Sequence, residues 1–217
     1  MTIKVLSVFG TRPEAIKMAP LALALAADAR FDARICVTGQ HREMLDQVMR
    51  LFDLSADHDL AVMRPGQDLT GVATAVLSGM AEVFAHQRPD MVLVHGDTLT
   101  TLAASLSAYW HRIPVAHVEA GLRSFNRRMP EEINRILTDH VSEWLFAPTQ
   151  FAMDMLENEG LGDRKLHLVG DVMYDVALEI AASRAQRNNP RAVLGLDDAP
   201  MVLATIHRQE NTDDPAR

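Results

Sequence analysis

The chain has 217 residues, of which 48% are hydrophobic and 23% are charged. These shares are ordinary for a globular protein, and the length allows one large domain or one domain and part of a second. The formal net charge of −8 lacks the basic excess of a nucleic-acid-binding surface, so no nucleic-acid partner is expected. The single cysteine, Cys36, excludes an intrachain disulfide. We expect neither a signal peptide nor a membrane span, and therefore a cytoplasmic protein.

Short apolar runs alternate with longer segments of helical period along most of the chain. In chain order, strands are expected over residues 3–9, 34–38, 60–63 (weakly), 91–95, 114–118, 144–147 and 166–169, and helices over residues 13–27, 42–52, 69–86, 98–111, 131–143 and 150–158. This alternation, with continuously apolar strands, is typical of a parallel sheet covered by helices on both faces. We therefore predict an α/β fold with a doubly wound, Rossmann-like parallel sheet over residues 1–170.

The last part of the chain has a different pattern. Residues 171–217 are expected to form a linker helix over 172–187 and one strand over 201–206. A segment of roughly 45 residues with one strand cannot close a core of its own. We interpret residues 171–217 as the beginning of an incomplete second domain, and the chain as a fragment.

Acidic residues lie where two predicted strands end and the next helix begins. Asp97 and Glu119 follow strands, and Glu131 and Glu132 begin a helix. Because ligands bind beyond the carboxyl ends of parallel strands, these acids are expected to meet in one crevice, where carboxylates can exchange protons with a carbon atom. Two simpler interpretations stay open. Asp97 can cap the following helix, and Glu131 and Glu132 can interact with the dipole of the helix that they begin.

Cations accompany the acids at the predicted crevice. After the first strand, Gly10 leads into a helix whose free N–H groups, with Arg12 and Lys17, suit a phosphate or diphosphate. A tight turn with solvated cations is the alternative. The glycine spacing does not match the dinucleotide fingerprint, so NAD binding is not supported. Arg123, behind Gly121, is expected to face the crevice.

Further polar residues follow other predicted strands. His207 and Arg208 follow the last one and would face the acids across an interdomain cleft. Gln40 and His41 follow the second strand, where a solvated helix start is the simpler interpretation. The histidines lack metal-ligand spacing, so no metal is predicted.

Together these motifs resemble the non-hydrolysing UDP-N-acetylglucosamine 2-epimerase family. The resemblance rests on residues 9–20, 38–45, 94–98, 117–123, 130–135 and 207–211 and covers essentially the whole chain. It implies the first half of a two-domain, glycosyltransferase-B-like fold, with the active site between two Rossmann-like domains. It further implies interconversion of UDP-GlcNAc and UDP-ManNAc without a cofactor, by an enzyme that is a homodimer at full length.

The resemblance also implies roles for single residues. Asp97, Glu119 and Glu131 would be the acid–base carboxylates, and His207 would contact the diphosphate or assist its departure. Four cations would help to bind the substrate: Arg12, Lys17, Arg123 and Arg208. Gln40 and His41 match part of a regulatory UDP-GlcNAc site of some bacterial members. Glu43 and Gly66 depart from the pattern of that site.

Other functions remain open. Residues 123–130 and 210–214 look closer to relatives that act on UDP-2,3-diacetamido-glucuronate, which is the runner-up substrate. A glycosyltransferase of the same fold and a nucleotide-sugar-binding module without turnover are further alternatives. We expect residues 1–217 alone to be inactive, because the groups that would grip the uridine lie beyond Arg217.

Overall fold

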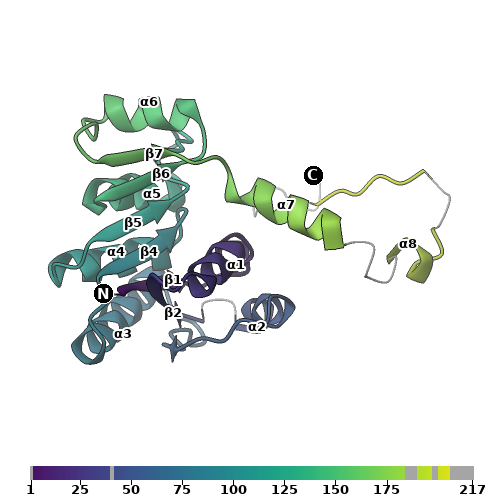
Figure 1. Ribbon diagram of the computed structural model, residues 1–217, viewed down its shortest axis with the longest axis horizontal. Coiled ribbons are helices and arrows are strands. Elements are labelled where there is room, and N and C mark those ends of the chain that lie inside the picture. The colour runs from purple at the N-terminus through teal and green to yellow at the C-terminus, as the bar shows by residue number, and fades with distance from the viewer. Residues whose placement is uncertain (1, 40–41, 184–189, 197–199, 206–217) are drawn as a thin grey trace. The chain divides into compact units, whose positions relative to one another are not determined.

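A computed structural model of the chain describes residues 2–39, 42–183, 190–196 and 200–205 (Figure 1). The chain forms two compact units, Met1–Leu178 and Glu179–Arg217. The first unit contains the whole sheet. Its strands are β1 (Ile3–Phe9), β2 (Phe31–Val37), β3 (His58–Asp59), β4 (Met91–His95), β5 (Val115–Val118), β6 (Trp144–Ala147) and β7 (Lys165–Leu168).

Helices connect these strands. They are α1 (Arg12–Ala27), α2 (Arg42–Leu51), α3 (Leu69–His86), α4 (Leu99–Trp110), α5 (Pro130–Val141) and α6 (Gln150–Asn158), followed by α7 (Val172–Ser183) and the short α8 (Pro190–Val193). The strand–helix alternation predicted from the apolar pattern is therefore confirmed through β7, with most boundaries within a few residues.

All strands of the sheet are parallel, in the order β3-β2-β1-β4-β5-β6-β7. The chain first adds strands on one side of β1 and then returns to place β4 on its other side. This reversal separates the loops after β1 and β4, and ligands of doubly wound sheets bind at the carboxyl ends of the strands at such a point.

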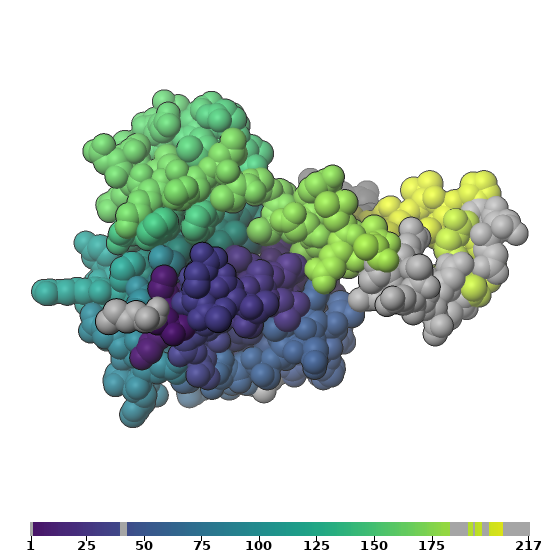
Figure 2. Space-filling view, in the orientation of Figure 1, coloured from purple at the N-terminus to yellow at the C-terminus, as the bar shows by residue number. Residues whose placement is uncertain are grey.

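Side chains of the strands alternate between two apolar layers. In β1, Leu6 and Val8 pack with buried residues of α3 and α4, whereas Val5 and Phe9 pack with those of α1 and α2. Figure 1 shows these helix pairs on opposite faces of the sheet, and Figure 2 shows the indigo atoms of α1 at the surface. A sheet buried on both faces explains why its strands are continuously apolar.

Two predicted strands differ from the structure. The third strand is only β3, beside Cys36–Val37, and residues 60–63 leave the sheet because Ala61 has φ 45°, which breaks the extended backbone. Residues 201–205 form no strand, and Val202 and Leu203 are 93% and 82% exposed. Within the described parts of the chain, no neighbouring strand supplies the hydrogen bonds that this segment would need. Residue 206 lies outside the described residues.

One helix, α3, meets the length and hydropathy expected of a membrane span, although no span was expected from the sequence. By length and composition it is long and apolar enough, with 18 residues and a mean hydropathy of 1.2, and it is the one such helix among the described residues. However, its buried stripe belongs to the core layer that covers β1 and β4 and comprises Val72, Val76, Met80, Val83 and Phe84. A helix with this stripe has the pattern of a core helix.

Candidate active site

The predicted acids meet at the carboxyl ends of β4 and β5, next to the point where the strand order reverses. In the register of these strands His95 lies opposite Val118, so Asp97 and Glu119 leave the sheet side by side. Helices α1 and α5 supply the surrounding cations. The predicted crevice therefore contains charged side chains from four different elements.

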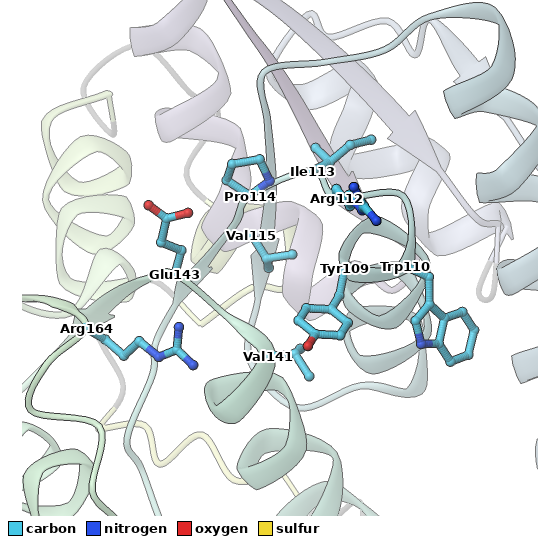
Figure 3. Close-up of a pocket in the computed structure, with 9 residues that line it drawn as sticks. All are labelled: Tyr109, Trp110, Arg112, Ile113, Pro114, Val115, Val141, Glu143 and Arg164. Atoms are coloured by element: carbon cyan, nitrogen blue, oxygen red, sulfur yellow. The ribbon is translucent and has the colours of Figure 1, made fainter.

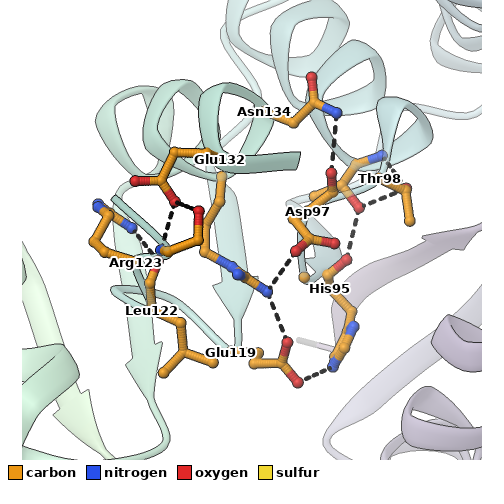
Figure 4. Close-up of polar contacts among 12 residues, drawn as sticks. His95, Asp97, Thr98, Glu119, Leu122, Arg123, Glu132 and Asn134 are labelled. Carbon is orange, nitrogen blue, oxygen red and sulfur yellow. Dashed lines mark hydrogen bonds and ion pairs between the residues drawn. The ribbon is translucent and has the colours of Figure 1, made fainter. Parts of the chain in front are cut away.

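Asp97 and Glu119 share one guanidinium. Arg135 Nη2 lies 3.0 Å from Asp97 Oδ2 and 2.8 Å from Glu119 Oε1. The close-up in Figure 4 shows both carboxylates pointing into the same space. Glu131 lies one helical turn before Arg135, is exposed, and its charge acts on Asp97. The expected convergence of the two strand-end acids is thus found, with Glu131 at its rim.

Glu119 has the most constrained position in the site. Its backbone φ is 66°, a left-handed conformation that costs about 1–3 kcal/mol for a residue with a side chain and clusters at functional sites. Its Oε2 forms an ion pair with Lys17 and lies 3.3 Å from Nε2 of the buried His95. Burial opposes ionisation of Glu119, but the contacts with His95 and Lys17 outweigh it and hold its pKa below the usual range.

Asp97 has the opposite electrostatic environment. Burial, helped by the negative charges of Glu119 and Glu131, outweighs the attraction of Arg135 and raises the pKa of Asp97 above its usual value. The helix-capping alternative for Asp97 is wrong, because the side chain of Thr98 accepts the capping hydrogen bond in α4. The Asp97 carboxylate is therefore not used as a helix cap and pairs with Arg135 instead.

The turn after β1 is fastened to the same region by Glu14. Its Oε2 accepts hydrogen bonds from the N–H groups of Gly10 (3.0 Å) and Thr11 (2.7 Å), which completes a capping box with Thr11. Its Oε1 accepts from the hydroxyls of Thr98 (2.6 Å) and Thr101 (3.1 Å) in the turn after β4. One buried carboxylate thus joins the two loops on either side of the sheet's reversal.

Two sequence-based expectations need correction. The Arg123 guanidinium does not face the crevice: its side chain is 1% exposed and binds Asp139 and Glu159, both at 2.7 Å. Charge-assisted hydrogen bonds with the buried Asp139 and the partly exposed Glu159 hold this cation away from solvent. Glu132 does more than interact with a helix dipole, because its carboxylate accepts hydrogen bonds from the backbone of Ser124 and Phe125.

The remaining predicted site residues are placed only in part. Arg12 is exposed in the first turn of α1, as a ligand-binding cation requires. Lys17 contacts Glu119 and is one α-helical turn further on. Four predicted residues lie outside the described residues: Gln40, His41, His207 and Arg208.

Sequence reasoning missed several residues that the fold brings into the site. Arg135 follows Glu131 by four residues, which places both on one face of α5, and this spacing could have indicated it. Asn134 donates to the backbone oxygen of Asp97 at 3.0 Å. His95 ends an apolar strand and lies beside Glu119, but a histidine at a strand end is no signal on its own.

A pocket at the amino ends of the strands, opposite the candidate site, contains none of these residues. Figure 3 shows its lining, which includes the exposed side chains of Tyr109 and Trp110 and the amino end of β5 at Val115. Ligands of doubly wound sheets bind at the carboxyl edge. Concavity alone therefore does not locate the chemistry in this molecule.

Comparisons with known proteins identify the family of this chain. The family model described as UDP-N-acetylglucosamine 2-epimerase matches residues 23–217. The chain belongs to the UDP-N-acetylglucosamine 2-epimerase family. The UDP-N-acetylglucosamine 2-epimerase of Escherichia coli K12 is 47% identical over 216 residues, which are 96% of this chain and 57% of that protein. The family resemblance of the motifs is thereby confirmed.

Solved structures of the family share the fold. The Neisseria meningitidis enzyme bound to UDP-GlcNAc has a TM-score of 0.83 and 44% identity, over 90% of this chain and 53% of that one. The Methanocaldococcus jannaschii enzyme with UDP-GlcNAc and UDP has a TM-score of 0.90 and 38% identity, over 98% of this chain and 59% of that one. The predicted fold class is confirmed, and the chain spans between half and three fifths of the length of these relatives.

Proposed function

We propose that this chain carries the acid–base site of a UDP-N-acetylglucosamine 2-epimerase, an isomerase that interconverts UDP-GlcNAc and UDP-ManNAc. The observation that carries the proposal is the pair of carboxylates, Asp97 and Glu119, on one nitrogen of Arg135. The names of the relatives, and the UDP-GlcNAc bound in two of the solved ones, support the choice of substrate.

The reaction needs proton exchange at C2 of the sugar. A base takes the C2 proton, the C2–H electron pair forms the C1=C2 bond, and the C1–O bond breaks as UDP leaves with its electron pair. Bound 2-acetamidoglucal and UDP result. In the return step an acid protonates C2 on the opposite face, and the UDP oxygen re-forms the bond to C1. Inversion therefore requires acid–base groups on two faces of the ring.

The two carboxylates are suited to different parts of this cycle. A raised pKa makes Asp97 a stronger base than an ordinary carboxylate and lets it hold the proton that it has taken. A lowered pKa keeps Glu119 ionised beside Lys17 and His95. Glu131, at the rim, is the third acid–base candidate. Environments that separate the pKa values of neighbouring carboxyls are typical of paired acid–base catalysts.

The departing diphosphate needs positive charge. We assign this role to the side chains of Arg12 and Lys17 in α1, because the N–H groups of Gly10 and Thr11 are taken up by Glu14. An incoming diphosphate would compete with Glu119 for Lys17, which would release that carboxylate as the substrate binds. From the family motif, His207 would assist departure of the diphosphate and Arg208 would help to bind it.

The decisive experiment is hydrogen exchange at C2. With the protein at its full natural length, UDP-GlcNAc in D2O should gain one deuterium at C2 and form UDP-ManNAc. Asp97→Asn and Glu119→Gln should abolish the exchange and keep the affinity for UDP within about tenfold, or roughly 1.4 kcal/mol. Residues 1–217 alone should show no turnover.

Other outcomes identify the rival functions. Sugar transfer to an acceptor without deuterium at C2 would favour a glycosyltransferase, and UDP affinity without any turnover would favour a binding module. Exchange only with UDP-2,3-diacetamido-glucuronate would favour the runner-up substrate, although the relatives from Escherichia coli and Yersinia pestis are named for UDP-N-acetylglucosamine.

Three further expectations belong to the whole protein. We propose a cytoplasmic homodimer, with residues 1–170 as the first domain and residues 171–217 as the start of the second. We also propose that Gln40 and His41 contribute to a regulatory UDP-GlcNAc site. Light scattering on the full-length protein tests the dimer, and a sigmoidal rate dependence on UDP-GlcNAc, lost in a His41→Ala variant, tests the regulation.

A further inference from the structure

A buried histidine–aspartate pair lies directly beneath the two acidic turns. His117, in β5, and Asp139, in α5, are both fully buried, and His117 Nδ1 lies 2.6 Å from Asp139 Oδ1. The other ring nitrogen, Nε2, lies 2.8 Å from the backbone oxygen of Gly96. A carbonyl oxygen only accepts hydrogen bonds, so Nε2 donates to Gly96 while Nδ1 faces the Asp139 carboxylate.

Asp139 extends the contact to the second turn. Its Oδ2 accepts a hydrogen bond from the N–H of Gly121 at 3.2 Å. The same oxygen forms an ion pair with Arg123 at 2.7 Å. Burial opposes ionisation of Asp139, but His117 and then Arg123 outweigh it and hold its pKa below the usual range. The carboxylate is therefore a fixed acceptor for both His117 and the Gly121 turn.

The two turns that this pair joins carry the candidate acid–base groups. Gly96 directly precedes Asp97, and Gly121 follows Glu119 by two residues. Gly96, Glu119 and Gly121 all have positive φ, at 71°, 66° and 81°. Glycine adopts positive φ readily, so the unfavourable conformation is that of Glu119, which persists only where the surrounding structure holds it. The hydrogen bonds to Gly96 and Gly121 supply that restraint at both turns.

We propose that His117 and Asp139 are positioning residues, which set the distance between the Asp97 and Glu119 carboxylates by tying their two turns to one buried ion pair. The effect of this buried ion pair on proton transfer rests on the proposed function. Neither side chain reaches the crevice, since both are fully buried. Their effect on proton transfer acts through the backbone that carries Asp97 and Glu119.

The kinetic test compares two carboxylates that share Arg123. Asp139→Asn removes the charge that holds His117, whereas Glu159→Gln removes the other partner of Arg123 and touches neither turn. In the full-length protein, Asp139→Asn should lower kcat by roughly 10- to 100-fold with KM and UDP affinity within about threefold, because misplacement of about 1 Å costs this much. Glu159→Gln should change kcat by less than about threefold. An equal loss of kcat in both variants, or a loss confined to KM, would overturn the proposal.

A measurement on the unaltered chain covers the case in which Asp139→Asn fails to fold. Nitrogen-15 NMR should show that the ring Nε2–H of His117 and the backbone amide of Gly121 are both protected from hydrogen exchange. Rapid exchange at either position would refute the pairing. These readouts need no turnover, so they decide the pairing even if the full-length protein shows no C2 exchange and the proposed function fails.

Discussion

The carboxylates of Asp97 and Glu119 contact the same nitrogen atom, Nη2 of Arg135, at 3.0 Å and 2.8 Å. The two acids are 22 residues apart in the chain, and their cation comes from a third element, α5. A single cation between two carboxylates reduces their mutual repulsion and fixes their separation. The charge of Arg135 therefore affects the ionisation of both acids at once.

Replacement of Arg135 by glutamine should impair catalysis and shift its pH dependence. Loss of the cation removes an attraction that favours both ionised carboxylates, so their pKa values rise. We expect kcat to fall about 100-fold, the usual effect of losing a preorganised charged donor, and the acidic limb of the kcat/KM profile to move to higher pH. Arg128→Gln, on the exposed loop before α5, is the matched control and should leave the profile in place.

The Asp97 and Glu119 carboxyls should affect stability in opposite directions. The pKa of Glu119 is lowered in the folded chain, so its contribution is present above the unfolded pKa of about 4 and is lost as pH falls through the folded value. The pKa of Asp97 is raised, so folding stability falls as pH rises from the unfolded pKa through the folded one.

Urea unfolding at pH 7 separates these two effects. Asp97→Asn should leave the free energy of unfolding unchanged or raise it by about 1 kcal/mol, because it removes an ionisation that burial opposes. Glu119→Gln should lower it by about 3 kcal/mol, since Lys17 and Arg135 lose a half-buried partner. A stabilised Glu119→Gln variant would contradict the assigned directions.

Gly121 should tolerate no side chain. A Cβ added there would lie 2.3 Å from the backbone oxygen of Ala152, in addition to the cost of its φ of 81°. Gly160 has the same φ of 81° but open space around it, so Gly160→Ala measures the backbone cost alone. We expect about 1 kcal/mol for Gly160→Ala and at least about 3 kcal/mol for Gly121→Ala in the free energy of unfolding. Equal losses would show that the close approach to α6 is absent.

Glu14→Gln should loosen the turn after β1. The carboxylate accepts four hydrogen bonds through two oxygens, whereas an amide keeps only one acceptor oxygen and cannot accept from all four donors. Because the site is buried, the free energy of unfolding should fall by roughly 2 kcal/mol. Glu43→Gln, exposed in the first turn of α2, should change it by less than about 0.5 kcal/mol. Thermal or urea unfolding of both variants checks the difference.

Much of the fold could be predicted from local pattern. Helix α3 and strands β4 and β6 have the predicted bounds, because a strand buried on both faces is continuously apolar and its neighbours are helical. The strand predicted over residues 60–63 was wrong because the left-handed backbone of Ala61 breaks it. Residues 201–205 form no strand because none of the described strands offers them hydrogen bonds, and pairing is not a property of an apolar run itself.

The sequence by itself determined the parallel α/β architecture, the family, and the position of Asp97 and Glu119 at strand ends, since these follow from periodicity and short motifs. Only the tertiary structure decided which charges meet. Lys17 pairs with Glu119 across 102 residues, and Arg123 turns away from the crevice to Asp139 and Glu159. Such pairings depend on sheet register and on how α1 and α5 pack, and electrostatic attraction selects among cations only after folding has brought them within a few ångströms.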